Sequence, residues 1–290
     1  MTVLAAPRSF LRLVAIEHSV FALPFAYLSA LTAMTVHGGG LRWTVLLLVT
    51  IAMVGARTFA MAANRIIDRH IDAQNPRTSK RELVTGAVRV RTAWTGAAVA
   101  LVVFLGAAAL LNPLCLVLSP LAVVPLIVYP YGKRFTDWPH AILAVAQAVG
   151  PVGAWLAVTG TFEGSWPAWV LGIAVGLWIG GFDLIYACQD TTVDREIGVR
   201  SVPARYGVPF ALGLSSVVHL VTFALFVYYG ELVDFGWLWW VGLALTAVAF
   251  GYQHVVVTPT DLSRVNRAFF TANGFVGIAL FAFAVLDSYS

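Results

Sequence analysis

The chain has 290 residues, of which 60% are hydrophobic and only 11% are charged. A water-soluble domain of this length does not need so much apolar sequence to build its core, so the composition excludes that class and predicts an integral membrane protein. The formal net charge is +4, but Lys and Arg are confined to short connections between apolar runs, a pattern that sets membrane topology and does not indicate nucleic-acid binding.

Apolar runs long enough to span a bilayer recur along the chain, since a spanning helix needs roughly 20 predominantly apolar residues. The first run follows Arg8 and Arg12 and is too long for the apolar region of a signal peptide, so we interpret it as a spanning helix. Glycine, proline and asparagine separate the runs. Nine spans are predicted, at 13–36, 43–67, 92–111, 114–130, 139–160, 167–188, 208–229, 236–257 and 268–286. The expected fold is an all-α, polytopic membrane bundle of nine transmembrane helices around a central cavity, formed as one domain over 1–290.

Basic residues predict the orientation of this bundle, because Lys and Arg are retained on the cytoplasmic side during insertion. Every second connection is rich in them, whereas the alternate connections carry almost none. The basic connections contain 69–91, 133–134, 195–205 and 264–267. We therefore expect the N-terminus on the cytoplasmic side of a bacterial-type plasma membrane and the C-terminus outside.

The second predicted span ends in a polar run with helical spacing, at Asn64, Asp68 and Asp72. Positions four apart lie on one helical face, so these residues form a single stripe of oxygen ligands. Carboxylates in such a stripe repel one another unless something positive neutralises them. One stripe alone is also compatible with a solvated helix end of mixed charge at the membrane boundary.

A second acid cluster follows the sixth predicted span. Asp190 and Asp194 are again four apart, and Asp183, seven before Asp190, returns to the same face after two turns. Two carboxylate stripes at one membrane face suit hard divalent cations, and Mg²⁺ binds through one or two carboxylates and completes its shell with water and substrate phosphates. Residues suited to holding a diphosphate lie between the clusters in sequence: Tyr129, Tyr131, Lys133 and Arg134. The expected site is a mouth of the bundle where carboxylates, metal, diphosphate and cations meet.

Three segments in this order strongly resemble the UbiA superfamily of intramembrane prenyltransferases. They are 64–78 (NRIIDRHIDAQNPRT), 129–136 (YPYGKRFT) and 181–194 (GFDLIYACQDTTVD). Within the superfamily the chain looks like the bacterial 4-hydroxybenzoate polyprenyltransferases. Segments 17–27 and 81–86 also look like the branch that acts on a dihydroxynaphthoate in the futalosine route to menaquinone.

The resemblance implies a role for each matching residue. Two magnesium ions that bind the prenyl diphosphate would be held by Asn64, Asp68, Asp72, Asp190 and Asp194. Lys133 would contact the diphosphate and act in catalysis with the four acids, and Arg69 and Arg134 would assist it. Further contacts with substrate are expected from Tyr129, Tyr131, Asp183 and Tyr186. The implied reaction transfers a polyprenyl group from an allylic diphosphate to 4-hydroxybenzoate or 1,4-dihydroxy-6-naphthoate, with Mg²⁺ as cofactor and diphosphate as the leaving group.

Two polar positions outside the motifs are also candidates. Arg57 lies two turns deeper than Asn64 on the same helix face, where it either grips the carboxylate of an aromatic acid or pairs with an acid on a neighbouring helix. His18 is expected to line a cavity, as a proton acceptor or as a simple hydrogen-bonding group. The other histidines show no ligand spacing and are interpreted as interfacial or packed: His70, His140, His219 and His254.

Other functions compete with this interpretation. Charged residues within spans also mark ion pathways in transporters, but a transporter predicts an internal repeat and broken helices near the midplane, whereas the acids here lie at one face. Relatives of the superfamily that prenylate haem share the acid motifs. A purely structural membrane protein leaves the two acid stripes unexplained.

Overall fold

Helices account for every regular element in the part of the chain that the structure describes. This computed structural model describes residue 13 and residues 22–288. Within them no strand forms, and the isolated bridge between Thr258 and Asp261 is the nearest approach to one. The long helices are α2 (Leu23–Val36), α3 (Trp43–Ile67), α5 (Val90–Leu111), α6 (Pro113–Phe135), α7 (Pro139–Thr159), α8 (Trp166–Ala187), α11 (Val208–Val233), α12 (Trp237–Val256) and α14 (Asn273–Asp287). The short elements are α4 (Arg69–Gln74), η2 (Cys188–Asp190), α9 (Thr191–Ile197), α10 (Val202–Tyr206), α13 (Val265–Arg267) and the π-turn η3 (Ala268–Ala272).

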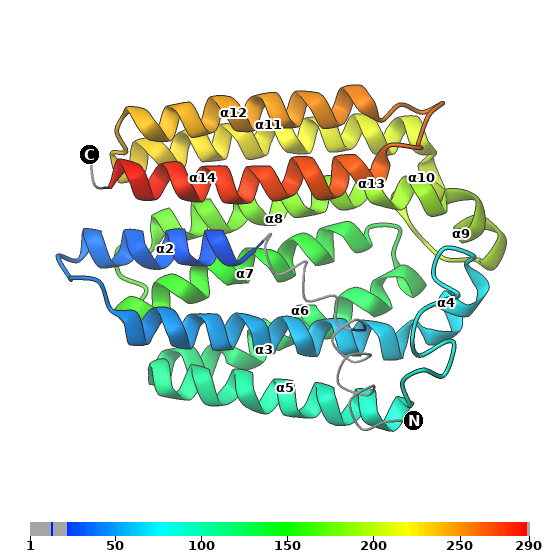
Figure 1. Cartoon of the computed structure of the whole chain (residues 1–290), viewed down its shortest axis with the longest axis horizontal. Helices are drawn as coiled ribbons and strands as arrows, with labels where there is room; N and C mark the ends of the chain where they lie inside the picture. The colour runs from blue at the N-terminus through cyan, green and yellow to red at the C-terminus, as the bar shows by residue number, and fades with distance from the viewer. Residues whose placement is uncertain (1–12, 14–21, 289–290) are drawn as a thin grey trace.

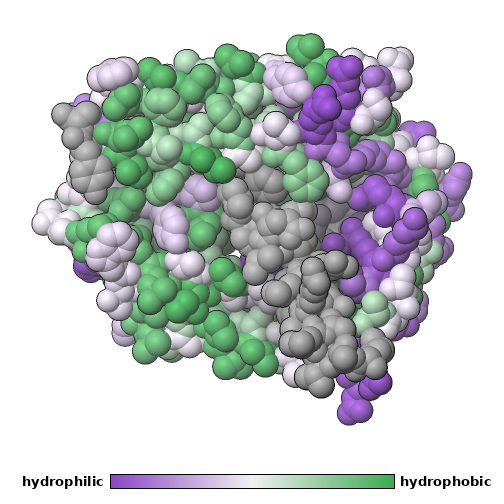
Figure 2. Space-filling view, in the orientation of Figure 1, coloured by the Kyte–Doolittle hydropathy of each residue, from purple (hydrophilic) through white to green (hydrophobic). Residues whose placement is uncertain are grey.

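The long helices run side by side along the long axis of the molecule, and the short helices α4, α9 and α10 gather at one end (Figure 1). Hydrophilic residues concentrate at that same end of the visible face, while apolar residues cover much of the rest (Figure 2). Large apolar side chains are exposed on the long helices, for example Leu110, Leu220 and Val248. An exterior of this kind is stable in lipid and not in water, so the chain is an integral membrane protein. We call the end that carries α4, α9 and α10 the polar end.

Seven of the described helical segments are long and apolar enough to cross a membrane, so the predicted count of nine is not confirmed. They are Trp43–Ile67, Val90–Leu111, Pro113–Phe135, Pro139–Thr159, Trp166–Ile197, Val208–Val233 and Val265–Asp287. The predicted first span is described only from residue 22 apart from Leu13, which leaves α2 with 14 residues. In α12, three tryptophans, Gln253 and His254 lower the hydropathy. These two spans, and the central cavity, stay predictions.

Small residues bring α7 and α8 into close contact. Gly172, Gly176 and Gly180 of α8 face the backbone of α7, and a Cβ added at Gly172 would stand 2.6 Å from the carbonyl oxygen of Ala148. At Gly180 it would stand 3.2 Å from the carbonyl oxygen of His140. Lipid tails give helices little hydrophobic reason to associate, so close packing over small residues is what holds such pairs together. This contact fixes the first turn of α7 against the second half of α8.

Helix α6 continues past the end predicted for it at residue 130, because proline is tolerated inside this membrane helix. It contains Pro120, Pro125 and Pro130. The carbonyl of Leu116, which loses its usual donor at Pro120, accepts a hydrogen bond of 2.7 Å from the Ser119 hydroxyl. The helix therefore runs on to Phe135 and carries Lys133 and Arg134 in its last turn.

Candidate active site at the polar end

The first acid stripe is built where α3 meets α4. The backbone N–H of Asp68 donates to the carbonyl of Asn64 at 2.9 Å, and that of Asp72 donates to the carbonyl of Asp68 at 2.8 Å. Both bonds have the helical spacing of four residues, although α3 ends at Ile67 and α4 begins at Arg69, with Asp68 between them at φ −91° and ψ 2°. The alignment of Asn64, Asp68 and Asp72 along one helical face stays a prediction.

Asp68 is the most completely buried of these acids, with 1% of its surface exposed. Two cations from the last turn of α6 hold its carboxylate. Lys133 Nζ donates to Oδ2 at 2.7 Å, and Arg134 Nη1 donates to Oδ1 at 3.0 Å. Arg134 also donates to the carbonyls of Ile67 and Pro130, both at 2.8 Å. A buried carboxylate needs such partners, and here they tie the end of α3 to the end of α6.

Asp72, on α4, is neutralised by the connection that follows it. Arg81 Nη1 donates to Asp72 Oδ1 at 2.5 Å, and the Thr78 hydroxyl donates to the Asp72 carbonyl at 3.0 Å. Both Asp72 and Thr78 are buried. Segment 75–89 therefore folds back over the first acid stripe.

The same connection also reaches the second acid cluster. Arg77 binds Asp190 through two nitrogens, with Nε at 2.9 Å from Oδ1 and Nη2 on Oδ2, and Asn75 Nδ2 donates to Oδ1 at 2.9 Å. Arg77 Nη1 donates to the Tyr186 hydroxyl at 2.9 Å, with the guanidinium lying 4.9 Å from the ring centre. Burial alone would lower the pKa of Arg77, but the pairing with Asp190 outweighs it and raises that pKa. Residues that follow the first acid stripe in the sequence therefore bind an acid of the second cluster.

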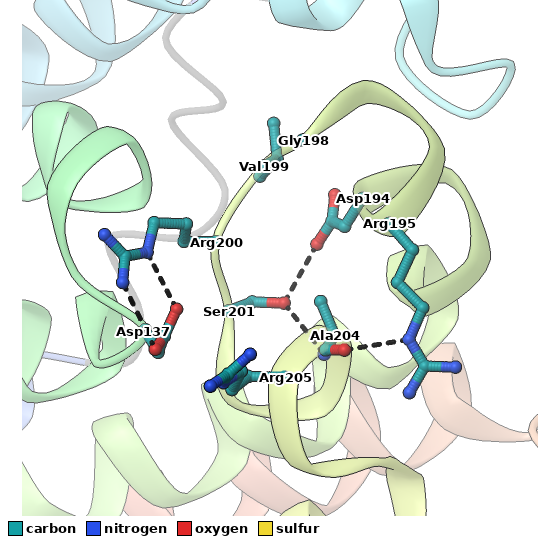
Figure 3. A pocket seen from close by; sticks show the side chains of 9 residues that line it. All are labelled: Asp137, Asp194, Arg195, Gly198, Val199, Arg200, Ser201, Ala204 and Arg205. Carbon is teal, nitrogen blue, oxygen red and sulfur yellow. Dashed lines mark hydrogen bonds and ion pairs between the residues drawn. The ribbon is translucent and has the colours of Figure 1, made fainter.

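Asp194, on α9, has no ion pair with any described cation. The residue is 8% exposed, and its carboxylate accepts one hydrogen bond from the described residues, from the Ser201 hydroxyl at 3.1 Å. Asp190, Lys133 and Arg77 lie within electrostatic range of it. Asp194 lines a pocket of about 340 Å³ at the polar end (Figure 3). The rest of the lining is Asp137, Arg195, Gly198, Val199, Arg200, Ser201, Ala204 and Arg205.

Asp183, one of the predicted substrate contacts, is paired with a histidine. His140 Nδ1 lies 2.7 Å from Asp183 Oδ2, and both side chains are largely buried. Tyr129 is within electrostatic range of Asp183 and of Asp68, so Asp183 belongs to the same region as the first acid stripe. Tyr131 is exposed and lies beneath the Arg134 guanidinium, 5.5 Å from the ring centre.

The remaining predicted residues are less closely tied to this cluster. Asn64 and Arg57 are half-buried on α3, and Arg57 lies two turns deeper in the bundle. Arg69 forms no ion pair with a described acid. His18 lies outside the described residues.

The predicted metal ligands do not form a closed metal cage. Within residues 22–288, no three His, Cys, Asp or Glu side chains approach closely enough to share one ion. The four acids lie instead in two pairs, of which Asp68, Asp72 and Asp190 are bound by Lys or Arg. Hard oxygen donors in this number fit Mg²⁺ only if each ion takes one or two carboxylates and completes its shell with phosphate oxygens and water.

Four partners of the acids were missed by reasoning from sequence: Asn75, Arg77, Arg81 and His140. The first three lie within or just after the first motif, so a rule that buried acids need cations would have pointed to the arginines. His140 was interpreted as interfacial or packed, and this was incomplete, because its partner Asp183 lies 43 residues away on another helix.

Comparisons with known proteins agree with this architecture. A family model described as the UbiA prenyltransferase family matches residues 22–275. A 4-hydroxybenzoate octaprenyltransferase from Pseudomonas aeruginosa is 32% identical over 83% of this chain and 80% of its own length. A 4-hydroxybenzoate solanesyltransferase from Synechocystis is 33% identical over 81% of both chains.

Solved structures give the same picture. A UbiA homologue from Aeropyrum pernix K1, solved in the apo state, is 35% identical with a TM-score of 0.85, and the match covers 94% of this chain and 98% of that one. A UbiA homologue from Archaeoglobus fulgidus bound to GPP and Mg²⁺ has a TM-score of 0.72 at 19% identity, covering 97% of this chain and 100% of that one. At 19% identity, the match to the Archaeoglobus fulgidus structure supports a shared fold only.

Proposed function

The chain belongs to the UbiA prenyltransferase family, and from this membership we propose that it transfers a polyprenyl group from an allylic diphosphate to 4-hydroxybenzoate in quinone biosynthesis. Relatives that are about one third identical are named as 4-hydroxybenzoate prenyltransferases. One observation on this chain carries the proposal: two acid clusters and four cations meet at the polar end of an apolar bundle. Family membership also favours this activity over transport.

The cations of the site suit a departing diphosphate. Lys133, Arg134, Arg77 and Arg81 each hold a carboxylate, but an arginine has five N–H donors and the lysine has three, so donors remain for phosphate oxygens. Breaking the allylic C–O bond leaves negative charge on the diphosphate. Fixed cations at the end of a poorly hydrated bundle stabilise that charge better than mobile water does.

Mg²⁺ is the cofactor we propose, held by Asn64, Asp68, Asp72, Asp190 and Asp194. A homologue of this fold was solved with GPP and Mg²⁺, and the acids here are hard oxygen donors of the kind this ion prefers. When bound, it supplies further positive charge against the diphosphate leaving group. Asp194, which has only a hydroxyl partner, is the acid most in need of a cation.

The rest of the chemistry takes place deeper in the bundle. Loss of diphosphate leaves a delocalised allylic cation, which an aromatic ring face such as that of Tyr129, half-buried on α6, would stabilise. Apolar walls keep water from quenching this cation. The electron-rich ring of the acceptor then attacks, and loss of a ring proton restores aromaticity. A lipid-soluble polyprenyl chain explains why the reaction takes place within a membrane.

Arg57 is the residue we assign to the carboxylate of the acceptor. It lies two turns deeper than Asn64 on α3, on the apolar side of the acid stripe. A guanidinium can form a two-pronged, charge-assisted contact with a carboxylate, which an aromatic acid provides and a neutral phenol does not. Arg57→Ala should therefore weaken acceptor binding by roughly 2–5 kcal/mol, and leave prenyl diphosphate binding nearly unchanged. Equal weakening of both substrates would return Arg57 to a structural role.

The enzyme is proposed to face the cytoplasm with its polar end, in a plasma membrane of bacterial type. The connections that carry the acid clusters are rich in Lys and Arg, including segments 69–91 and 195–205, and such connections stay on the cytoplasmic side. Cysteine labelling of segment 79–89 from each side of the membrane tests this orientation, and labelling from outside would overturn it.

A membrane assay tests the function as a whole. Membranes containing the protein are incubated with a long-chain prenyl diphosphate and either 4-hydroxybenzoate or 1,4-dihydroxy-6-naphthoate, with and without Mg²⁺. We expect prenylated 4-hydroxybenzoate only when Mg²⁺ is present. Prenylation of the naphthoate alone would move the enzyme to the menaquinone branch, which segment 81–86 also resembles. Product in neither case would contradict transfer to an aromatic acid.

A further inference from the structure

We propose that His140 is a positioning residue that orients the Asp183 carboxylate to accept a hydrogen bond from the hydroxyl group of the aromatic acceptor. This inference rests on the proposed function, because it presumes an acceptor with a phenolic hydroxyl. It adds a recognition element for the end of the acceptor opposite the carboxylate that Arg57 would bind.

The pair is short and well shielded from solvent. His140 Nδ1 lies 2.7 Å from Asp183 Oδ2, and the two side chains are 7% and 17% exposed. A carboxylate oxygen can only accept, so Nδ1 carries the proton and this contact fixes both the ring orientation and the tautomer of His140. In such surroundings a hydrogen bond to a charged group is stronger than it would be in water.

Two neighbouring helices, α6 and α8, hold the backbone turn that carries the imidazole. The carbonyl of His140 lies against Gly180 of α8, where an added Cβ would stand 3.2 Å from it. On the other side, Gly132 of α6 leaves room for Pro139 and Ile142, which a Cβ would approach to 3.3 and 2.9 Å. The first turn of α7 is therefore held between α6 and α8. A fixed backbone turns one hydrogen bond into a defined carboxylate orientation.

Among the described residues, Asp183 is the only hydrogen-bond partner of the His140 imidazole. His140 Nε2 is buried and has no hydrogen-bond partner there, whereas a histidine that serves packing usually has both nitrogens satisfied. The pairing with Asp183 is therefore the interaction that explains a histidine at this position.

Asp183 keeps an oxygen for a ligand. No described residue donates to Oδ1, since the only hydrogen bond to this side chain is the one from His140 to Oδ2. Asp183 lies seven residues before Asp190, about 10 Å further into the bundle along a helix, and Tyr129 is in electrostatic range of both Asp183 and Asp68. A group at this depth suits an acceptor ring placed beyond the diphosphate. A phenol bonded to a carboxylate is also more electron-rich, which favours attack by its ring carbon.

Binding of two matched ligands tests the inference on the full-length protein in nanodiscs. 4-Hydroxybenzoate offers the hydroxyl donor, and 4-methoxybenzoate has the same carboxylate without that donor. We expect the wild-type protein to bind 4-hydroxybenzoate at least tenfold more tightly, and His140→Leu to lose most of this preference by weakening that ligand alone. The KM for prenyl diphosphate should stay unchanged, while the KM for 4-hydroxybenzoate rises.

Further variants separate positioning from general damage. His140→Asn places an amide donor near the position of Nδ1 and should restore most of the preference, and His70→Leu, at an exposed histidine of α4, should have no effect. If His140→Leu does not fold, His140→Phe provides the same comparison, because it keeps a ring of similar size without the hydrogen-bond donor.

The outcomes distinguish this inference from the proposed function. Folded His140→Leu protein that keeps the wild-type preference, or that weakens both ligands and prenyl diphosphate alike, would overturn the positioning role while leaving the proposed reaction in place. A wild-type protein that binds neither benzoate and prenylates neither would overturn the proposed acceptor, and the inference with it.

Discussion

The two acid clusters of this protein look alike in sequence but differ in how their charges are balanced. In the first, Asp68 and Asp72 are both bound by Lys or Arg from later in the chain. In the second, Asp190 is bound by Arg77, whereas Asp194 has only the hydroxyl of Ser201. Three of the four acids are therefore neutralised by the protein itself, and one is not.

This difference suggests that the clusters have different tasks. A buried carboxylate without a cation is costly, so Asp194 has the most to gain from an added positive charge. The acids that already hold cations also fix the ends of helices and connections, as Asp68 does between α3 and α6. We therefore expect substitutions at Asp68 to have the largest effect and those around Asp194 to act more locally.

The largest effect is predicted for Asp68→Ala. The change leaves Lys133 and Arg134 without their carboxylate and removes a proposed metal ligand. A single group that stabilises developing charge contributes about 3–4 kcal/mol, so prenyl transfer should fall by at least about a hundredfold. Turnover in membranes with matched protein levels measures it, and Glu163→Ala, at an exposed acid of the connection between α7 and α8, is the control. Near-normal turnover of Asp68→Ala would remove Asp68 from the site.

A smaller effect is predicted for Arg77, which links the clusters. Arg77→Ala frees segment 75–89 from Asp190 and should raise the KM for prenyl diphosphate by roughly ten- to a hundredfold, the usual range for losing a residue that orients a metal or substrate ligand. Arg77→Lys should recover only part of this, because an ammonium cannot reproduce the contacts to both oxygens and the stacking on Tyr186. If Arg77→Lys behaves as wild type, charge alone matters at this position and the link between the clusters is not specific.

Local spacing explains which part of the first acid stripe could be predicted. Asn64, Asp68 and Asp72 are four residues apart, and the backbone hydrogen bonds from Asp68 to Asn64 and from Asp72 to Asp68 have that spacing. The pairing of Asp190 with Arg77 spans 113 residues and that of Asp183 with His140 spans 43. Such pairs depend on how helices pack, which no local pattern encodes. Proline misled the prediction at α6 because nearby hydroxyls and neighbouring helices satisfy the backbone groups that it frees.

The smallest effect is predicted for Ser201, and it probes the acid that lacks a cation. The Ser201 hydroxyl donates to Asp194 Oδ2 at 3.1 Å and accepts from the backbone N–H of Ala204 at 3.3 Å, where it caps α10. Ser201→Ala should therefore cost about 1 kcal/mol of stability, and lower activity only a few-fold, because Asp194 itself remains.

Two further substitutions at Ser201 separate the cap from the contact with Asp194. Ser201→Thr keeps both hydrogen bonds and should match the wild type. Ser201→Asp keeps the cap but sets a second buried carboxylate beside Asp194, and the two like charges should lower both the activity and the thermal midpoint further than Ser201→Ala does. Thermal melting and turnover are measured on the same preparations. If Ser201→Asp is as active as the wild type, the charge on Asp194 does not govern the reaction, and the contrast between the two clusters has no functional meaning.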